Sequence, residues 1–254
     1  MEEYDFIKEV PAKNELVGRR EELALLKESM FKKRMKNTIL VGEAGCGKTA
    51  ILEQFAYDMK HHFNLVELDI GACVAGTSLR GQFEEKLVDF LSKTAKNNKD
   101  SSKKTIIFID EIHTIYNAGG SDGAIDASNI LKSYLSRGEI TIIGATTREE
   151  YESTIKKDKA LNRRLSPLFI KELDDKTNIE ILRKFNEGYL NDNLVLYIYE
   201  KSKTMPGSNP DKAIEILDRC MAKQIFTGKY VTEHSVNDII KFMKEGMIWW
   251  KMRK

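Results

Sequence analysis

The chain has few cysteines, and none of them stands in a spacing that binds a metal. Cys46, Cys73 and Cys220 are the three cysteines among 254 residues, and they form no C-x-x-C pair. An odd number without metal spacing predicts free thiols, which are typical of a reducing compartment and favour the cytoplasm. His61, His62 and His113 have no ligand spacing with Cys or Glu either, so we do not expect them to bind a metal.

Long apolar runs and a strong net charge are also missing. No stretch of about 18 apolar residues occurs, which argues against a membrane span. The N-terminus is acidic and lacks a basic segment before an apolar core, so we expect no signal peptide. The formal net charge is only +2, and no basic stripe with interleaved aromatics is present, so neither nucleic acid nor membrane is an expected partner. The mixture of 41% hydrophobic and 31% charged residues suits a soluble globular protein.

A glycine-rich loop is the most informative motif. It fits the pattern G-x-x-x-x-G-K-[ST], it follows a short apolar strand at 38–41, and a helix with one apolar face comes after it. A chance glycine-rich turn would match the pattern alone, but these flanks favour a nucleotide-binding loop. The loop and the residue after it are Gly42, Glu43, Ala44, Gly45, Cys46, Gly47, Lys48, Thr49 and Ala50.

The loop residues have distinct expected roles. Glycines allow consecutive backbone N–H groups to turn towards phosphate oxygens, and the N-terminus of the following helix favours the same anion. Lys48 is expected to reach the β- and γ-phosphates. The Thr49 hydroxyl is expected to ligate Mg²⁺.

A second acidic motif completes this chemistry. The stretch 105–109 is short, apolar and β-branched, which is typical of a buried parallel strand. Asp110 and Glu111 follow it. An acidic turn at a strand end is common, but together with the phosphate loop it predicts that Asp110 orients Mg²⁺ and that Glu111 acts as general base on an attacking water.

Alternating strands and helices predict the fold. Apolar runs indicate five strands, with helices between them and a loop over 71–81, and this alternation favours a parallel sheet with flanking helices. From about residue 173 only helical patterns remain, apart from an ambiguous stretch at 194–199. We therefore predict an N-terminal arm over 1–14, a large α/β ATPase domain over 15–172 and a small all-α lid domain over 173–254. The predicted strands are 38–41, 64–70, 105–109, 139–145 and 168–170.

At this point the chain resembles a known family, the Clp-type AAA+ unfoldases and disaggregases, in their first ATPase module. The matching stretches lie in family order across 15–220, which is far more specific than either ATPase motif alone. They are 16–22, 42–50, 68–72, 75–76, 80–85, 108–114, 144–151, 157–164 and 210–214.

The resemblance implies further roles. The backbone of Val17 and Gly18 would line an adenine pocket, and Thr147, beside Thr146, would sense the γ-phosphate. Arg163 and Arg164 would be arginine fingers that reach the next subunit's site, although spacing alone also fits an exposed helix end. Pro210 would begin the lid helix over the nucleotide. ATP and Mg²⁺ are the implied cofactors, and a homo-oligomeric ring, hexameric in this family, is the implied assembly.

Three departures from the family pattern are visible. The implied pore loop comprises Gly76, Leu79, Arg80 and Gly81, and Leu79 stands where the family usually has an aromatic residue that grips substrate. The connection at 187–192 is shortened. We also expect the usual N-terminal substrate domain, the second ATPase module and its docking loop for a Clp-type peptidase to be missing.

Two functions remain open on the sequence alone. The first is a Mg²⁺-ATP hydrolase that remodels or unfolds a protein substrate as a ring. The second is an ATP-gated assembly or regulatory subunit that binds a partner protein without threading it, which Leu79 and the expected missing domains favour.

Overall fold

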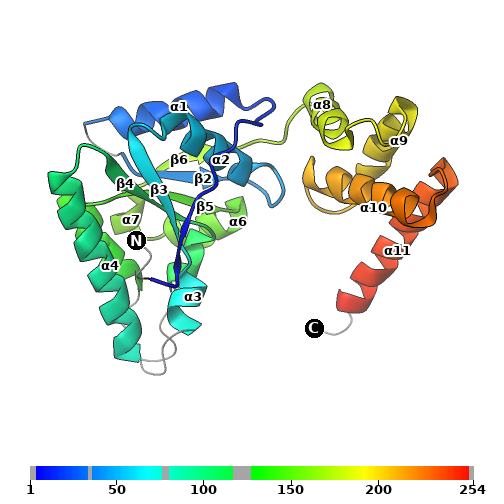
Figure 1. The fold of residues 1–254 in the computed structure, drawn as a ribbon. Helices are drawn as coiled ribbons and strands as arrows, with labels where there is room; N and C mark the ends of the chain where they lie inside the picture. The colour runs from blue at the N-terminus through cyan, green and yellow to red at the C-terminus, as the bar shows by residue number, and fades with distance from the viewer. Residues whose placement is uncertain (1–3, 34–35, 76–79, 117–126, 252–254) are drawn as a thin grey trace. The chain divides into compact units, whose positions relative to one another are not determined.

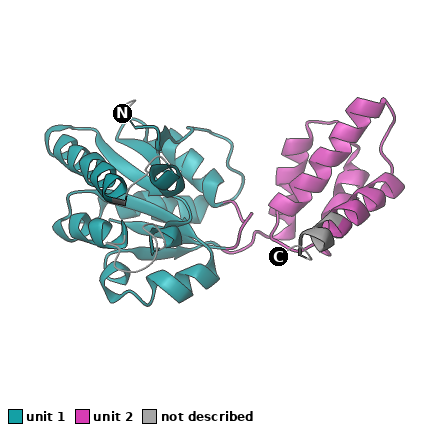
Figure 2. Cartoon of the chain, turned by 90° about the horizontal axis from the view of Figure 1, so that it is seen from below, with its two compact units in different colours: residues 1–42, 48–170 teal, residues 43–47, 171–254 magenta. Residues whose placement is uncertain are grey.

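The computed structural model describes the chain except for residues 1–3, 34–35, 76–79, 117–126 and 252–254. By its internal contacts the chain divides into two compact units (Figure 2). The first comprises residues 1–42 and 48–170, and the second comprises 43–47 and 171–254. Within the described residues, no helix is long and apolar enough to cross a membrane.

A six-stranded sheet with the order β1-β3-β4-β5-β2-β6 forms the centre of the first unit (Figure 1). The five predicted strands all form, and they run parallel to one another. A sixth strand, β1, pairs antiparallel with β3 and places Ile7 opposite Leu68. The predicted five-stranded parallel sheet is therefore extended to a mixed, mostly parallel one. The strands are β1 (Ile7–Glu9), β2 (Thr38–Val41), β3 (Phe63–Leu68), β4 (Lys104–Ile109), β5 (Thr141–Thr146) and β6 (Ser166–Phe169).

Helices follow the strands, and one of them corrects the sequence prediction. The segment 71–81 was expected to be a loop, but α3 occupies its first part. The carboxylate of Asp69 accepts a hydrogen bond from the Ala72 N–H at 2.9 Å, and this side-chain capping favours a helix start among small residues. The helical segments of the unit are α1 (Arg20–Phe31), α2 (Lys48–Met59), α3 (Ile70–Ala75), α4 (Arg80–Asp100), the 3₁₀ segment η1 (Ile112–Tyr116), α5 (Ala127–Arg137), α6 (Arg148–Glu150), the π-helical segment η2 (Tyr151–Ile155) and α7 (Lys159–Asn162).

The sheet is buried on both faces, as its apolar parallel strands require. Ile39 and Val41 belong to a core cluster shared with residues of α4 and α5. Leu40 lies between them and is also fully buried, because successive side chains of a strand point to opposite faces. The helices α1 and α2 pack against each other on that other side (Figure 1).

The second unit is helical. It contains α8 (Asp175–Asn186), α9 (Asp192–Ser202), α10 (Asp211–Thr227) and α11 (Glu233–Lys251). The ambiguous stretch at 194–199 is part of α9, whose Asn191 side chain caps the helix by accepting from the Leu194 N–H. One core, which includes Leu182, Ile198 and Leu217, joins the four helices.

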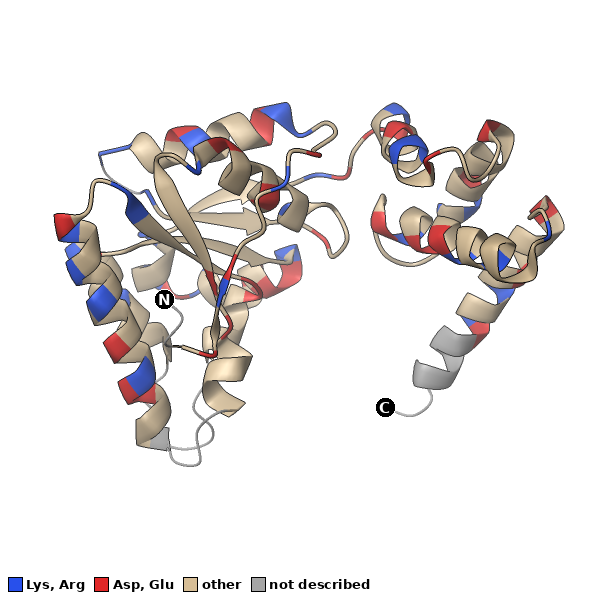
Figure 3. Cartoon of the chain, viewed as in Figure 1, with Lys and Arg blue, Asp and Glu red and all other residues tan. Residues whose placement is uncertain are grey.

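Charged residues of both signs are interspersed on the helices of both units (Figure 3). Along α4, for example, blue and red positions follow one another. This distribution agrees with the small formal net charge of +2.

Candidate functional site

The phosphate loop begins where β2, the strand next to the edge strand β6, ends. Strand β2 lies between β5 and β6, and the Gly42 N–H that follows it donates to the Thr146 carbonyl at 3.1 Å. Gly45 and Gly47 have φ values of 77° and 95°, a left-handed backbone that glycine adopts without strain. The first residue of α2 is Lys48, and its Nζ donates to the Gly42 carbonyl at 2.7 Å. The ammonium group is thus held at the residue that follows β2.

The acidic pair follows β4, which β5 separates from β2, at the same edge of the sheet. Ile109, the last residue of β4, lies opposite Gly144 of β5, so Asp110 and Glu111 continue towards the level at which β5 ends. Both side chains are exposed. Glu111 has a φ of 45°, and its N–H donates to the Asp110 carboxylate at 2.9 Å. This bond supports a left-handed conformation that is uncommon for a residue with a side chain.

Glu67 was missed by the sequence analysis. It is on β3, opposite Phe108, and it is partly buried. Burial, and next the negative charge of Asp110, raise the pKa of the Glu67 carboxyl above its ordinary value. The acidic edge of the sheet therefore includes a third carboxyl group, and the only sequence signal for it was a charged residue within an apolar strand.

The end of β5 carries a polar network. The Thr147 side chain and Glu150 form a capping box at the start of α6: the Thr147 hydroxyl accepts from the Glu150 N–H, and the Glu150 carboxylate accepts from the Thr147 N–H. Glu150 Oε2 also lies 2.7 Å from Thr147 Oγ1 and 3.2 Å from Thr146 Oγ1. His113 of η1 reaches the same group, with Nδ1 3.1 Å from Thr146 Oγ1 and Nε2 3.2 Å from Glu150 Oε1. The sequence signal for Glu150 was the T-x-x-E spacing of a capping box.

The two arginines expected to act as fingers lie at the end of α7. Arg163 is exposed, and its Nε donates to the Lys159 carbonyl at 3.0 Å, while Arg164 Nη1 donates to the Ala160 carbonyl at 2.6 Å. Asp158 caps this helix by accepting from the N–H groups of Ala160 and Leu161. Both guanidinium groups are therefore hydrogen-bonded to carbonyl groups of α7, a short helix whose start is capped by Asp158.

Val17 and Gly18 precede α1. Gly18 has a φ of 69°, and the N–H of the neighbouring Leu16 donates to Gln54 Oε1 of α2 at 3.2 Å. This bond attaches the segment to the helix that begins at Lys48.

Pro210 lies in the second unit, at the N-cap position of α10. The N–H of the preceding Asn209 donates to Glu172 Oε1 at 2.8 Å, which fixes the start of this helix within that unit.

The predicted pore loop is largely beyond what the structure describes. Gly76 and Leu79 lie outside the described residues, and Arg80 and Gly81 are the first residues of α4.

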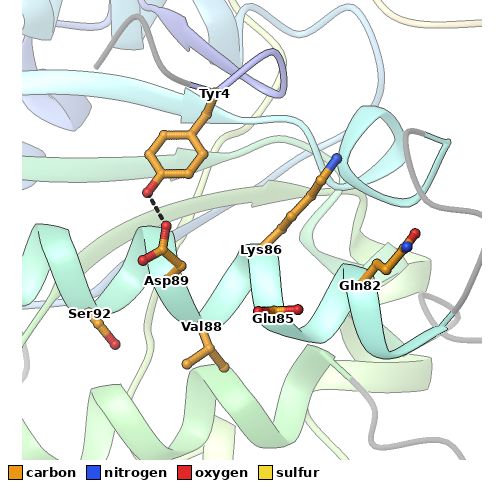
Figure 4. A pocket seen from close by; sticks show the side chains of 7 residues that line it. All are labelled: Tyr4, Gln82, Glu85, Lys86, Val88, Asp89 and Ser92. Carbon is orange, nitrogen blue, oxygen red and sulfur yellow. Dashed lines mark hydrogen bonds between the residues drawn. The ribbon is translucent and has the colours of Figure 1, made fainter.

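A separate hollow runs along α4 (Figure 4). The Tyr4 hydroxyl donates to Asp89 there at 2.6 Å. Burial, and next this hydrogen bond, raise the pKa of Tyr4. No residue that was predicted to bind a nucleotide lines this hollow, which is formed by Tyr4, Gln82, Glu85, Lys86, Val88, Asp89 and Ser92.

Comparison with known proteins identifies the family. The family described as "ATPase family associated with various cellular activities (AAA)" matches residues 38–173. The chain belongs to the AAA family. It is 38% identical over 225 residues to the chaperone protein ClpB of Rickettsia conorii and 37% identical over 225 residues to the Clp protease ATP-binding subunit ClpC of Staphylococcus saprophyticus, in each case over 82% of this chain. It spans about a quarter of the length of these relatives, 26% and 27%.

Solved structures of Hsp104 share the fold of this AAA chain. A closed-state reconstruction of Hsp104 with ATPγS and FITC casein has a TM-score of 0.76 at 29% identity, and it covers 90% of this chain and 43% of the other. The S. cerevisiae Hsp104–ADP complex has a TM-score of 0.74 at 29% identity, covering 86% and 33%. The predicted relationship to Clp-type AAA+ ATPases, and the α/β fold followed by a helical region, are thus confirmed.

The residues present fit Mg²⁺ bound together with a nucleotide. Within the described residues, no group of three or more His, Cys, Asp or Glu side chains could hold a metal by itself. Magnesium at such sites is commonly held by one or two protein oxygens together with phosphate oxygens. The exposed Thr49 hydroxyl and the exposed Asp110 carboxylate are hard oxygen donors of that kind. Their role, like the roles of the other predicted site residues, stays a prediction.

Proposed function

We propose that this AAA chain hydrolyses Mg²⁺-bound ATP and uses the cycle to remodel or unfold a protein substrate as a subunit of an oligomeric ring. The observation that carries the proposal is the meeting of three motifs at one edge of the sheet. The phosphate loop follows β2, the acidic pair follows β4, and the threonine pair ends β5, while the Gly42–Thr146 hydrogen bond ties the first to the third.

Each motif has one task in this proposal. The loop N–H groups and Lys48 bind the phosphates, and Thr49 and Asp110 hold Mg²⁺, which when bound offsets negative charge on the phosphate oxygens. Glu111 accepts the proton of the attacking water. The Thr147 hydroxyl donates a hydrogen bond to the γ-phosphate and so distinguishes ATP from ADP. Arg163 and Arg164 of one subunit stabilise charge that develops in a neighbour's site.

The polypeptide substrate is proposed from similarity. The Clp relatives include a protein named as a chaperone, and two Hsp104 structures are described as containing casein. The alignment covers about a quarter of the curated relatives, so the activity and the partners of those whole proteins are not transferred directly.

The test is ATP turnover measured in the purified chain and in two variants. Lys48→Ala should weaken nucleotide binding because it removes the cation at the loop. Glu111→Gln should retain binding and slow turnover by about 10²–10⁴-fold, the scale of a general base. An equal loss of nucleotide binding in both variants would contradict these assignments, and a wild-type chain without turnover would contradict the hydrolase itself.

The second candidate, a partner-binding regulatory subunit, is favoured by Leu79 at the expected pore-loop position. A leucine offers a smaller contact than an aromatic ring and no polar tip, so its grip on a polypeptide should be weaker. Unfolding of a tagged test protein, followed in parallel with ATP turnover, separates the two candidates. Turnover without unfolding favours the regulatory subunit, and vigorous unfolding of a stable protein favours the remodelling enzyme.

A further inference from the structure

The carboxylate of Glu150 holds more partners than a helix cap needs. A capping box accounts for its bonds with Thr147. It does not account for Thr146 Oγ1 at 3.2 Å from the same oxygen, or for His113 Nε2 at 3.2 Å from the other oxygen. Glu150 is therefore the common partner of the turn that follows β5 and the turn that follows β4.

The packing of η1 on β5 creates this arrangement. A Cβ on Gly144 would lie 2.8 Å from Ile112 Cδ1, so η1 packs closely on β5 and a side chain at this position would force Ile112 to shift. The Thr114 N–H donates to the Glu111 carbonyl at 2.8 Å, which joins η1 to the general base. The turn after β4 that contains Glu111 therefore also places His113 next to Thr146.

Proton positions follow from the chemistry of the groups. A carboxylate can only accept, so the contact with Glu150 assigns a proton to His113 Nε2. Burial alone would raise the pKa of Glu150, but the hydrogen bonds from the Thr147 hydroxyl and N–H, the charge of His113 and the Thr146 hydroxyl together lower it. Glu150 is therefore ionised at neutral pH. Its short bond to Thr147, 2.7 Å, uses the single proton of that hydroxyl.

A phosphate oxygen also only accepts. Thr147 can donate its one proton to Glu150 or to a γ-phosphate, but not to both. We propose that Glu150 competes with the γ-phosphate for the Thr147 proton, and that His113 weakens Glu150 as a competitor, so that these two positioning residues set the preference of the site for ATP over ADP. This inference rests on the proposed role of Thr147.

The two residues should act in opposite directions. Glu150→Gln keeps a side chain that suits the capping box but replaces a charged acceptor with a weaker neutral one. The Thr147 hydroxyl then donates to the γ-phosphate more readily, and the ratio of ATP to ADP affinity should rise by about threefold to tenfold. His113→Ala removes a donor from Glu150, leaves the carboxylate a stronger acceptor for Thr147, and should lower the ratio by about twofold to fivefold.

The experiment is isothermal titration calorimetry with ADP and with the β,γ-imido analogue of ATP, on the full chain with Mg²⁺. Glu152→Gln is the matched control, because Glu152 is in the adjoining η2 segment and pairs with the exposed Lys156 at 2.6 Å. Its ratio should equal that of the wild type. The double variant His113→Ala, Glu150→Gln should follow Glu150→Gln, since His113 acts through the carboxylate.

The outcomes separate this inference from the proposed hydrolase. Shifts of opposite sign support the competition whether or not the chain turns ATP over. A ratio that stays unchanged in Glu150→Gln, or that falls in both single variants, overturns the competition even if wild-type turnover is normal. Thermal unfolding of each variant identifies loss of folding. A His113→Gln variant, whose amide can donate to Glu150, should restore the wild-type ratio of ATP to ADP affinity that His113→Ala loses.

Discussion

At the scale of single residues, two cysteines show how burial controls chemistry. Cys73 and Cys220 are free and fully buried, and burial raises the pKa of each thiol to about 11. At about pH 8, on the order of one thiol in a thousand is then ionised, and the thiolate is the reactive form. We predict that iodoacetamide labels both residues much more slowly in the native chain than in urea, as peptide mass spectrometry would measure. Rapid native labelling of either residue would contradict its burial.

Residue identity explains why part of the site could be predicted and part could not. The phosphate loop and the acidic pair are contiguous motifs, so sequence pattern alone indicated Lys48 and Glu111 as candidates. The Glu150 network joins His113 to residues 33 or more positions away, as in the His113–Thr146 contact. Register between β4 and β5 creates that contact, and a single sequence does not state register. Because register is not visible in the sequence, the sequence analysis gave His113 no role in this network.

At the scale of secondary-structure elements, α7 depends on one cap. Asp158 accepts from the Ala160 N–H at 2.9 Å and the Leu161 N–H at 3.1 Å, and it pairs with Lys132 at 2.6 Å. We predict that Asp158→Ala costs about 0.5–2 kcal/mol of stability, which corresponds to a drop in Tm of about 2–4 °C per kcal/mol for a chain of this size. Asp158→Asn should lose less, because an asparagine side chain still caps.

The pH dependence of this contribution has a definite sign. Burial alone would raise the pKa of Asp158, but the hydrogen bond from Lys132 and the N–H groups of Leu161 and Ala160 lower it. A folded pKa below the unfolded value gives stability that is present above the unfolded pKa, about 3.9, and lost as the pH falls through the folded value. Differential scanning calorimetry should therefore show the gap between wild type and Asp158→Asn closing in acid. A gap that stays constant down to about pH 2 would contradict the ion pair.

The elements that the sequence predicted well are those whose own pattern is strong. The strands β2 and β4 are mostly apolar and rich in β-branched residues, and all five predicted strands formed. The edge strand β1 has three residues, two of them exposed, so it shows no alternation, and only pairing with β3 reveals it. Helix α9 contains the apolar run 194–199, and periodicity over so few residues does not distinguish a buried helix from a strand. The Asn191 cap decides in favour of the helix.

At the scale of the whole molecule, the proposed ring makes each catalytic site the product of two subunits. Arg163 and Arg164 donate to carbonyl groups of α7. The guanidinium group of Arg163 is exposed, and such a group exchanges this bond at little cost for a phosphate. We predict that Arg163→Ala, Arg164→Ala protein binds ATP but barely hydrolyses it. Mixing it in equal amounts with Lys48→Ala protein should restore turnover, because about a quarter of randomly formed head-to-tail interfaces combine an intact loop with intact fingers.

Turnover per chain would be measured against the mixing ratio, with mass photometry reporting assembly with and without ATP. The arginines do not act between subunits if mixtures stay as inactive as their components, or if the wild type reaches its full specific rate as a monomer.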